Sequence, residues 1–155
     1  MPTLPNIHQL LSQGYLISTD KALFDIDEAF DMIANRSYWA IGMPRERFET
    51  AVKNSLLFGV YHNGVTVGMA RVISDYGTFA YICDVFIDEA HRGRGLSKWL
   101  VSEIMSHPDL QGLRRWSLAT STAHGLYSQY GFVPISKPQD WMEIRRPYIQ
   151  QNEGN

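Results

Sequence analysis

The spacing of apolar residues changes along the first half of the chain from helical to strand-like. Asp25 and Glu28 have the capping-box spacing that opens a helix, and apolar positions recur at helical spacing after Asp25. A second helical face follows Pro44. The next stretch instead carries continuous apolar runs, separated by an Asn63-Gly64 pair that favours a two-residue hairpin turn. Together with a short apolar run at residues 15–18, the pattern predicts a first strand, two helices and then an antiparallel hairpin.

A long β-rich strand, a glycine-rich loop and a helix follow one another in the middle of the chain. The strand ends near Ile87, and apolar residues at helical spacing then begin at Leu96 and stop before Pro108. The remaining pattern predicts a strand at 116–120, a short helix at 123–130, and strands at 132–135 and 141–145. This order indicates an α+β fold with a central mixed, mostly antiparallel sheet flanked by helices.

Composition limits the classes of function. The chain has 155 residues, of which 45% are hydrophobic and 19% charged, so we expect one folded domain over residues 1–149 and a flexible tail at 150–155. The formal net charge is -2. Such a balance gives no global basic field for nucleic acid or an anionic membrane surface, so any anion site must be local.

The sequence carries no targeting or metal signal that we recognise. The first residues lack both a basic region and an apolar core of a signal peptide, and no run approaches the length of a membrane span. Cys83 is the only cysteine and has no histidine at metal-ligand spacing. We therefore expect a cytoplasmic protein without a metal site.

The most informative local feature is the segment Arg92-Gly-Arg-Gly-Leu-Ser97, which lies between the long strand and its helix. Glycines allow a ligand to approach the backbone, and free N–H groups at a helix N-terminus favour an anion. Arginines and Lys98 add positive charge. By itself the segment indicates either a pyrophosphate site or a tight turn. ATP and dinucleotide loops fit poorly, because no Gly-Lys-Ser/Thr follows and Lys98 replaces the third glycine of the dinucleotide pattern.

Together with the later segment Tyr127-Ser-Gln-Tyr-Gly131-Phe132, this loop resembles the GNAT family of N-acetyltransferases. The resemblance implies a GNAT-like acyl-CoA N-acyltransferase fold and acetyl-CoA as the acyl donor. It further implies that the loop binds the pyrophosphate of coenzyme A and that the preceding strand binds the pantetheine arm through its backbone. The corresponding cofactor-binding positions here are Val85, Phe86, Ile87, Arg92, Gly93, Arg94, Gly95, Leu96, Ser97 and Lys98.

The same resemblance suggests Tyr127 as the general acid, because it has the family's spacing to the Gly-Phe pair. A phenol with a pKa of about 10 stays protonated at neutral pH and can donate to a departing thiolate. Without that spacing, a tyrosine packed on a short helix is the simpler interpretation. The family often has an asparagine seven residues before this tyrosine, and Thr120 stands there in this chain.

Asp84 is the candidate general base, since it interrupts an apolar strand where an unpartnered carboxylate would be costly. Strict alternation along the strand places Asp84 on one face with Ile82 and Phe86. The alternative to catalysis is a structural ion pair with Arg71 or a hydrogen bond to a tyrosine. Several aromatic residues would line an acceptor pocket or belong to the core: Tyr38, Trp39, Phe79, Tyr81 and Trp141.

These observations favour an N-acetyltransferase that moves the acetyl group of acetyl-CoA to a primary amine by direct attack in a ternary complex. The acceptor is not identified by the sequence. The alternative function is a non-catalytic module that binds acyl-CoA and senses it or regulates a partner. An edge strand near the C-terminus would allow a homodimer.

Overall fold

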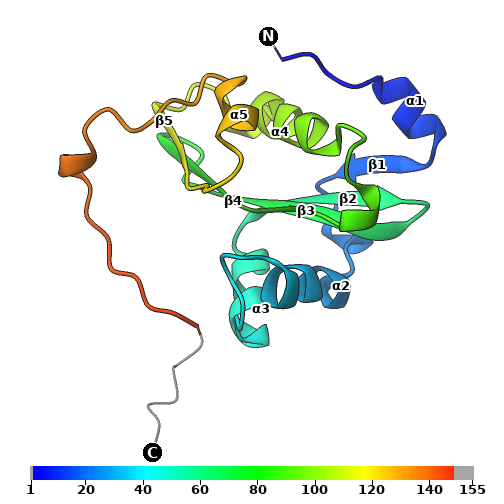
Figure 1. Cartoon of the computed structure of the whole chain (residues 1–155), viewed down its shortest axis with the longest axis horizontal. Helices are drawn as coiled ribbons and strands as arrows, with labels where there is room; N and C mark the ends of the chain where they lie inside the picture. Colours follow the sequence, from blue (N-terminus) through cyan, green and yellow to red (C-terminus); the bar gives the residue numbers. More distant parts are fainter. Residues whose placement is uncertain (1, 149–155) are drawn as a thin grey trace, which may run out of the picture.

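The computed structural model describes residues 2–148, and the predicted tail at 150–155 lies outside this range. Its centre is a five-stranded sheet in the order β1-β2-β3-β4-β5, visible in Figure 1. Strands β1 to β4 pair with one another antiparallel, in sequence order, and β5 pairs with β4 in parallel. The strands are β1 (Tyr15–Ser18), β2 (Leu56–His62), β3 (Val65–Ser74), β4 (Phe79–Ile87) and β5 (Arg115–Leu118).

Helices cover both faces of this sheet. Figure 1 shows α2 and α3 on one face, and α4 and α5 on the other. The helices are α1 (Ile7–Ser12), α2 (Ile26–Asp31), α3 (Arg45–Lys53), α4 (Leu96–Ser106) and α5 (His124–Ser128), and α2 continues into a π-helical turn at Met32–Arg36. The mixed sheet between helices confirms the predicted α+β fold.

Each face of the sheet has its own hydrophobic core. One buried cluster joins the sheet to α4 and includes Leu100 and Ile104, which have no exposed surface. The other joins the opposite face to α2 and α3 and includes Phe48 and Met69, also fully buried. The sheet is therefore held by burial of apolar surface on both sides.

Local sequence signals explain several element boundaries. Asp25 caps α2, because its carboxylate accepts hydrogen bonds from the N–H groups of Asp27 and Glu28 at 3.0 and 3.2 Å. The predicted hairpin is present, and Asn63 and Gly64 have φ values of 49° and 82°, as a tight two-residue turn between twisted strands requires. These two predictions are confirmed.

The strand β4 contains a bulge that the alternation rule missed. Met69 pairs with Phe86, whereas Arg71 pairs with Cys83, so two residues of β4 lie opposite one residue of β3. Asp84 adopts the left-handed conformation there, with a φ of 51°. Ile82 consequently belongs to the core beneath α4, and Phe86 to the core on the other face. The prediction that Ile82, Asp84 and Phe86 share one face was wrong.

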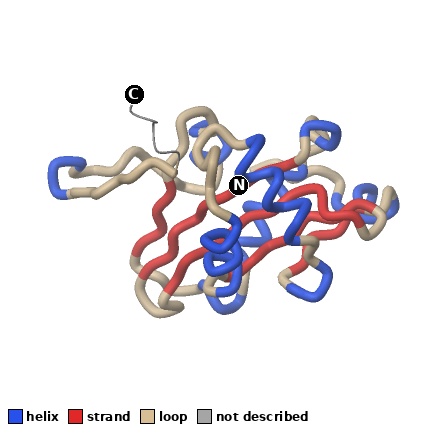
Figure 2. Tube along the Cα trace, turned by 90° about the horizontal axis from the view of Figure 1, so that it is seen from below, coloured by secondary structure: helices blue, strands red, loops and turns tan. Residues whose placement is uncertain are grey.

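The two strands predicted near the C-terminus are also absent from the described residues. Residues 132–135 and 141–145 are extended but form no ladder, and the segment projects from the body as an arm in Figures 1 and 2. Proline at 134 removes one backbone donor, and a strand needs a hydrogen-bonding neighbour as well as β-prone residues. Phe132 alone turns inward and packs against the core beneath α4.

Candidate active site

The site begins where β4 and β5 separate. Residues Phe79 to Ile82 of β4 pair with Arg115 to Leu118 of β5, but β4 continues to Ile87 without a strand on that side within the described residues. A cavity of about 560 Å³ opens at the separation. Its walls come from the middle of β4 (residues 81–85), the loop before α5, the segment between α2 and α3, and the C-terminal arm.

Asp84 lies in the wall of this cavity with both carboxylate oxygens engaged. Its side chain accepts a hydrogen bond from the indole N–H of Trp39 at 2.9 Å and forms an ion pair with Arg71 at 2.7 Å. Arg71 also donates to the hydroxyl of Ser55 at 2.7 Å, and Asp84 is only 7% exposed. The ion pair considered as the alternative to catalysis is therefore present, and the role of Asp84 as base stays a prediction.

Tyr127 reaches the same cavity from α5. It is 6% exposed, and its ring packs edge-on against Phe132 at a centroid distance of 6.0 Å. Burial raises the pKa of the Tyr127 phenol to about 12. The group is therefore protonated throughout the physiological pH range, which is the state that a proton donor needs.

Tyr38 is a second tyrosine of the cavity, which the sequence left undecided between pocket and core. Its side chain is 57% exposed, and its hydroxyl accepts a hydrogen bond from the backbone N–H of Ser121 at 3.2 Å. Hydrogen bonds from Ser121 lower the pKa of Tyr38 to about 8. Tyr38 thus links the segment after α2 to the loop before α5, across 83 positions of sequence.

Cys83 borders the cavity but is a poor nucleophile. Burial raises the pKa of its thiol to about 12, so the reactive thiolate is scarce at neutral pH. Cys83 is therefore best described as a small apolar residue of the strand.

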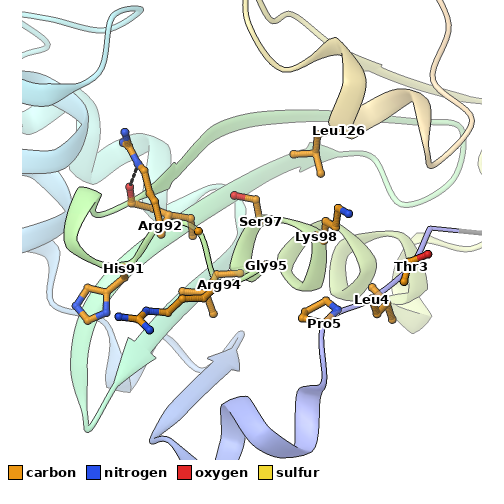
Figure 3. Close-up of a pocket in the computed structure, with 13 residues that line it drawn as sticks. Thr3, Leu4, Pro5, His91, Arg92, Arg94, Gly95, Ser97, Lys98 and Leu126 are labelled. Atoms are coloured by element: carbon orange, nitrogen blue, oxygen red, sulfur yellow. Dashed lines mark hydrogen bonds between the residues drawn. The ribbon is translucent and has the colours of Figure 1, made fainter.

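A second cavity, of about 660 Å³, lies over the glycine-rich loop and is drawn in Figure 3. Gly93 and Gly95 have φ values of 82° and 84°, which side-chain-bearing residues rarely adopt. The first helical hydrogen bond of α4 joins the N–H of Trp99 to the carbonyl of Gly95 at 3.1 Å, and no side chain of the described residues caps this helix end. The N–H groups at the start of α4 are therefore free for an anion.

The charged residues of the loop differ in how they are held. Arg92 donates from its Nε to the carbonyl of Ile87 at 2.8 Å, and its guanidinium lies 5.1 Å from the centre of the Phe86 ring. Arg94 lies over the ring of Tyr15 at 5.9 Å. Figure 3 shows Ser97 and Lys98 on the first turn of α4 beside the cavity. The loop thus combines an arginine held by a backbone carbonyl with a half-buried lysine on the first turn of α4.

The predicted cofactor residues do not all present side chains to the two cavities. Val85 lines the cavity between β4 and β5, and Ile87 lines the one over the loop. Phe86 is buried on the opposite face of the sheet, and the side chain of Leu96 is 2% exposed in the core. Phe86 and Leu96 are consequently available to a ligand only through their backbone.

Two parts of the site carried no recognisable signal in the sequence. Thr3, Leu4 and Pro5 run along the cavity over the loop, as Figure 3 shows. Glu143 and Arg145 of the C-terminal arm border the other cavity. Both sets of residues come from near the chain ends, and neither belongs to a motif that would predict a place in the site.

Comparison with known proteins identifies the family. The profile of the Acetyltransferase (GNAT) family matches residues 21–132, which span strands β2 to β5, the glycine-rich loop and the Tyr127 helix. The chain belongs to the GNAT family. A candidate acetyltransferase from Gibberella zeae is 31% identical over 137 residues, covering 74% of this chain and 76% of that protein. GNAT membership makes the protein an acyltransferase.

Solved structures agree with this GNAT assignment. A candidate GNAT acetyltransferase from Xanthomonas campestris is 48% identical, with a TM-score of 0.85, and the match covers 89% of this chain and 97% of that one. A Clostridium acetobutylicum protein solved with acetyl-CoA shares the fold at 14% identity and a TM-score of 0.56, covering 84% and 94% of the two chains. Among the described residues of this GNAT protein, no helix is long and apolar enough to cross a membrane.

Proposed function

We propose that this GNAT protein transfers the acetyl group of acetyl-CoA to a primary amine by direct attack in a ternary complex. The observation that carries the proposal is the position of two cavities at the open end of β4. One holds the uncapped N-terminus of α4, and the other holds the protonated phenol of Tyr127. A donor with a pyrophosphate at one end and a thioester at the other fits such an arrangement.

The loop and the first turn of α4 fit the pyrophosphate of the donor. A Cβ atom at Gly93 would meet nothing within 4 Å, so the backbone there is open to a ligand. Backbone N–H groups at the start of α4, together with Arg94 and Lys98, would hold the phosphates. The unpaired side of β4 from Val85 to Ile87 would hydrogen-bond the pantetheine amides through backbone groups.

The chemistry needs a neutral amine and a protonated leaving sulfur. The amine nitrogen attacks the thioester carbonyl carbon, the carbon–sulfur bond breaks, and the electron pair leaves with the sulfur. Tyr127 is proposed to give its proton to that sulfur, since its pKa of about 12 keeps it protonated beforehand. The proton lost by the amine would go to a base or a water in the same cavity.

The sequence suggests Asp84 as the general base, and the hydrogen bonds that its carboxylate accepts limit how it could take a proton from the amine. Both of its oxygens accept hydrogen bonds, from Trp39 and Arg71, so it would take a proton only by weakening one of them. A water held between Asp84 and the amine is compatible with this restraint.

We also expect the protein to act in the cytoplasm, since this is where its single cysteine would stay reduced.

The test of the donor is thermal unfolding with and without acetyl-CoA, because it requires no knowledge of the acceptor. Ligand at about 100 times its dissociation constant stabilises a fold by about 2.7 kcal/mol. A rise in unfolding temperature with acetyl-CoA, and none with NAD or ATP, would support the proposal. No rise at millimolar acetyl-CoA would contradict it.

Thiol release in the presence of a panel of amines then tests the transfer. Turnover with any amine excludes the alternative, a non-catalytic acyl-CoA sensor. Binding of acetyl-CoA without thiol release across the panel would favour that alternative.

A further inference from the structure

Arg36, the last residue of the π-helical turn after α2, is surrounded by carboxylates. Its guanidinium nitrogens lie close to four of them: Glu89 at 2.8 Å, Asp31 at 3.2 Å, Asp88 at 3.3 Å and Glu28 at 3.9 Å. The shortest contact reaches the 3₁₀ turn that leads from β4 into the glycine-rich loop. Because the Arg36 side chain is only 27% exposed, water screens these contacts less than it would on the open surface.

Glu89 lies between two arginines. One of its carboxylate oxygens accepts a hydrogen bond from Arg36 at 2.8 Å, and the other is 3.9 Å from a guanidinium nitrogen of Arg92. The second distance is too long for a hydrogen bond. Glu89 is therefore held mainly by Arg36, and its attraction for Arg92 is correspondingly small.

Arg92 lines the cavity over the loop, but its present partners lie away from the phosphate-binding turn. Its Nε donates to the carbonyl of Ile87 at 2.8 Å, and in Figure 3 its side chain extends away from Ser97 and Lys98. The side chain is 53% exposed, so it has room to turn. Arg92 can consequently pair either with the groups that hold it here or with the phosphates of a bound donor.

Arg36 and Glu89 affect this choice in opposite directions. The ion pairs of Glu89 within the described residues are those with Arg36 and Arg92. Without Arg36, the Glu89 carboxylate would pair with Arg92 alone and hold it away from the donor phosphates. Donor affinity falls in proportion to the fraction of the protein in which the binding group is available.

We propose that Arg36 is a positioning residue for donor binding, which engages Glu89 and so leaves Arg92 available to the pyrophosphate of the donor. The inference rests on the proposed use of acetyl-CoA. It assigns a role to a residue that lines neither of the two cavities. Glu89 is then a competitor of the donor for Arg92, and its carboxylate is not needed for donor binding.

The test is the dissociation constant of acetyl-CoA, measured by isothermal titration calorimetry. Arg36→Gln should weaken binding about tenfold, whereas Glu89→Gln should bind acetyl-CoA at least as tightly as the wild type. The double variant Arg36→Gln/Glu89→Gln should regain most of the lost affinity, because the competitor for Arg92 is gone. An ion pair that only stabilises the loop would give a different pattern, in which each single variant weakens binding and the double variant does not recover.

Arg92→Gln gives a second, independent comparison. By itself it should weaken acetyl-CoA binding by about as much as Arg36→Gln. Adding Arg36→Gln to Arg92→Gln should cause little further loss, because both changes remove the same contact with the phosphates. Fully additive losses would mean that Arg36 acts on the donor by another route and would contradict the proposal.

The matched control is Arg45→Gln, since Arg45 also pairs with two carboxylates, Asp27 and Glu49, and lines neither cavity. It should keep the dissociation constant of the wild type. Arg36→Lys retains a positive charge near Glu89 and should recover part of the affinity that Arg36→Gln loses. Thermal unfolding of each variant without ligand separates loss of folding from loss of donor binding.

Failure of this inference can be distinguished from failure of the proposed function. A wild type that does not bind acetyl-CoA contradicts the proposed function, and the role of Arg36 falls with it. A wild type that binds, together with an Arg36→Gln variant that binds equally well, overturns only the role of Arg36. Equal losses in Arg36→Gln and Glu89→Gln, without recovery in the double variant, overturn it as well.

Discussion

Side chains that line the opening between β4 and β5 have roles set by burial and by their hydrogen-bond partners. Tyr127 and Tyr38 illustrate this at the scale of the residue, because they are the same residue type in one cavity. Burial raises the pKa of Tyr127 to about 12, and hydrogen bonds from Ser121 lower that of Tyr38 to about 8. Tyr127 therefore stays protonated at every physiological pH, whereas part of the Tyr38 population ionises at mildly alkaline pH.

Replacing Tyr127 by phenylalanine removes the proposed proton donor with little change in packing. We expect kcat to fall by roughly 10²-fold or more, the usual contribution of general acid catalysis. The temperature rise caused by acetyl-CoA should remain, because the donor is held elsewhere. The matched control is Tyr130→Phe, whose hydroxyl bonds to Ser102 and Lys98 outside the cavity. Near-normal turnover in Tyr127→Phe would remove Tyr127 from the mechanism.

Asp84→Asn separates catalysis from structure, since it keeps the shape of the side chain and removes its charge. Breaking a buried ion pair leaves Arg71 uncompensated, so we expect a loss of about 3 kcal/mol in the free energy of unfolding. If Asp84 is also the base, turnover falls, and activity no longer rises with pH in the same range as in the wild type. An unchanged pH profile with reduced stability would limit Asp84 to holding Arg71 and Trp39.

The ionisation of Tyr38 can be followed directly by tyrosinate absorbance. Because the folded-state pKa lies near 8 instead of 10, the phenol loses its proton two pH units earlier than an ordinary tyrosine. We expect an absorbance step with a midpoint near pH 8 in the wild type and its absence in Tyr38→Phe. Tyr76→Phe, which removes an exposed phenol from the turn after β3, should retain the step. A step that persists in Tyr38→Phe would contradict the assignment.

At the scale of the element, the glycine-rich loop depends on one backbone conformation at two positions. Gly93 and Gly95 both have positive φ, but a Cβ at Gly93 would meet nothing, whereas one at Gly95 would lie 2.8 Å from the Cβ of Pro5. The entry into α4 is therefore restricted by the N-terminal segment as well as by the turn itself.

Gly93→Ala and Gly95→Ala form a matched pair that measures this restriction. Alanine at positive φ costs about 1 kcal/mol at either position. Gly95→Ala should lose about 1 kcal/mol more, because Pro5 must move. Denaturant unfolding of both variants checks the difference, and equal losses would mean that the N-terminal segment shifts freely.

Much of this element structure could be predicted from short-range signals. The Asp25 cap, the Asn63-Gly64 turn and the glycine loop each act within a few residues, so the sequence pattern reveals them. The bulge at Asp84 could not be predicted, because it depends on pairing with β3. The bond from Ser121 to Tyr38 was equally hidden, since it joins positions far apart in the chain.

At the scale of the whole molecule, one sheet is shared by two cores. Leu100 lies in the core beneath α4 and Met69 in the core facing α2 and α3, and neither has exposed surface. Since every strand from β2 to β4 contributes to both cores, we expect the two cores to unfold together.

Leu100→Ala and Met69→Ala test this dependence. Each substitution should lower the free energy of unfolding by about 2 to 5 kcal/mol. The losses should add in the double variant, since the side chains lie on opposite faces, and each variant should unfold in one cooperative transition. Val65→Ala, at a position 60% exposed, serves as the control and should change stability by less than about 0.5 kcal/mol. A two-step transition would show that the faces fold separately.

The path of Thr3, Leu4 and Pro5 along the loop cavity has a practical consequence. A group attached ahead of these residues starts at the mouth of the cavity over the glycine loop. A bulky affinity tag there would compete with the donor, whereas a small environment-sensitive dye would respond to its arrival. The N-terminal side of this segment is thus a natural place for an optical reporter of occupancy, one that needs no acceptor and no turnover.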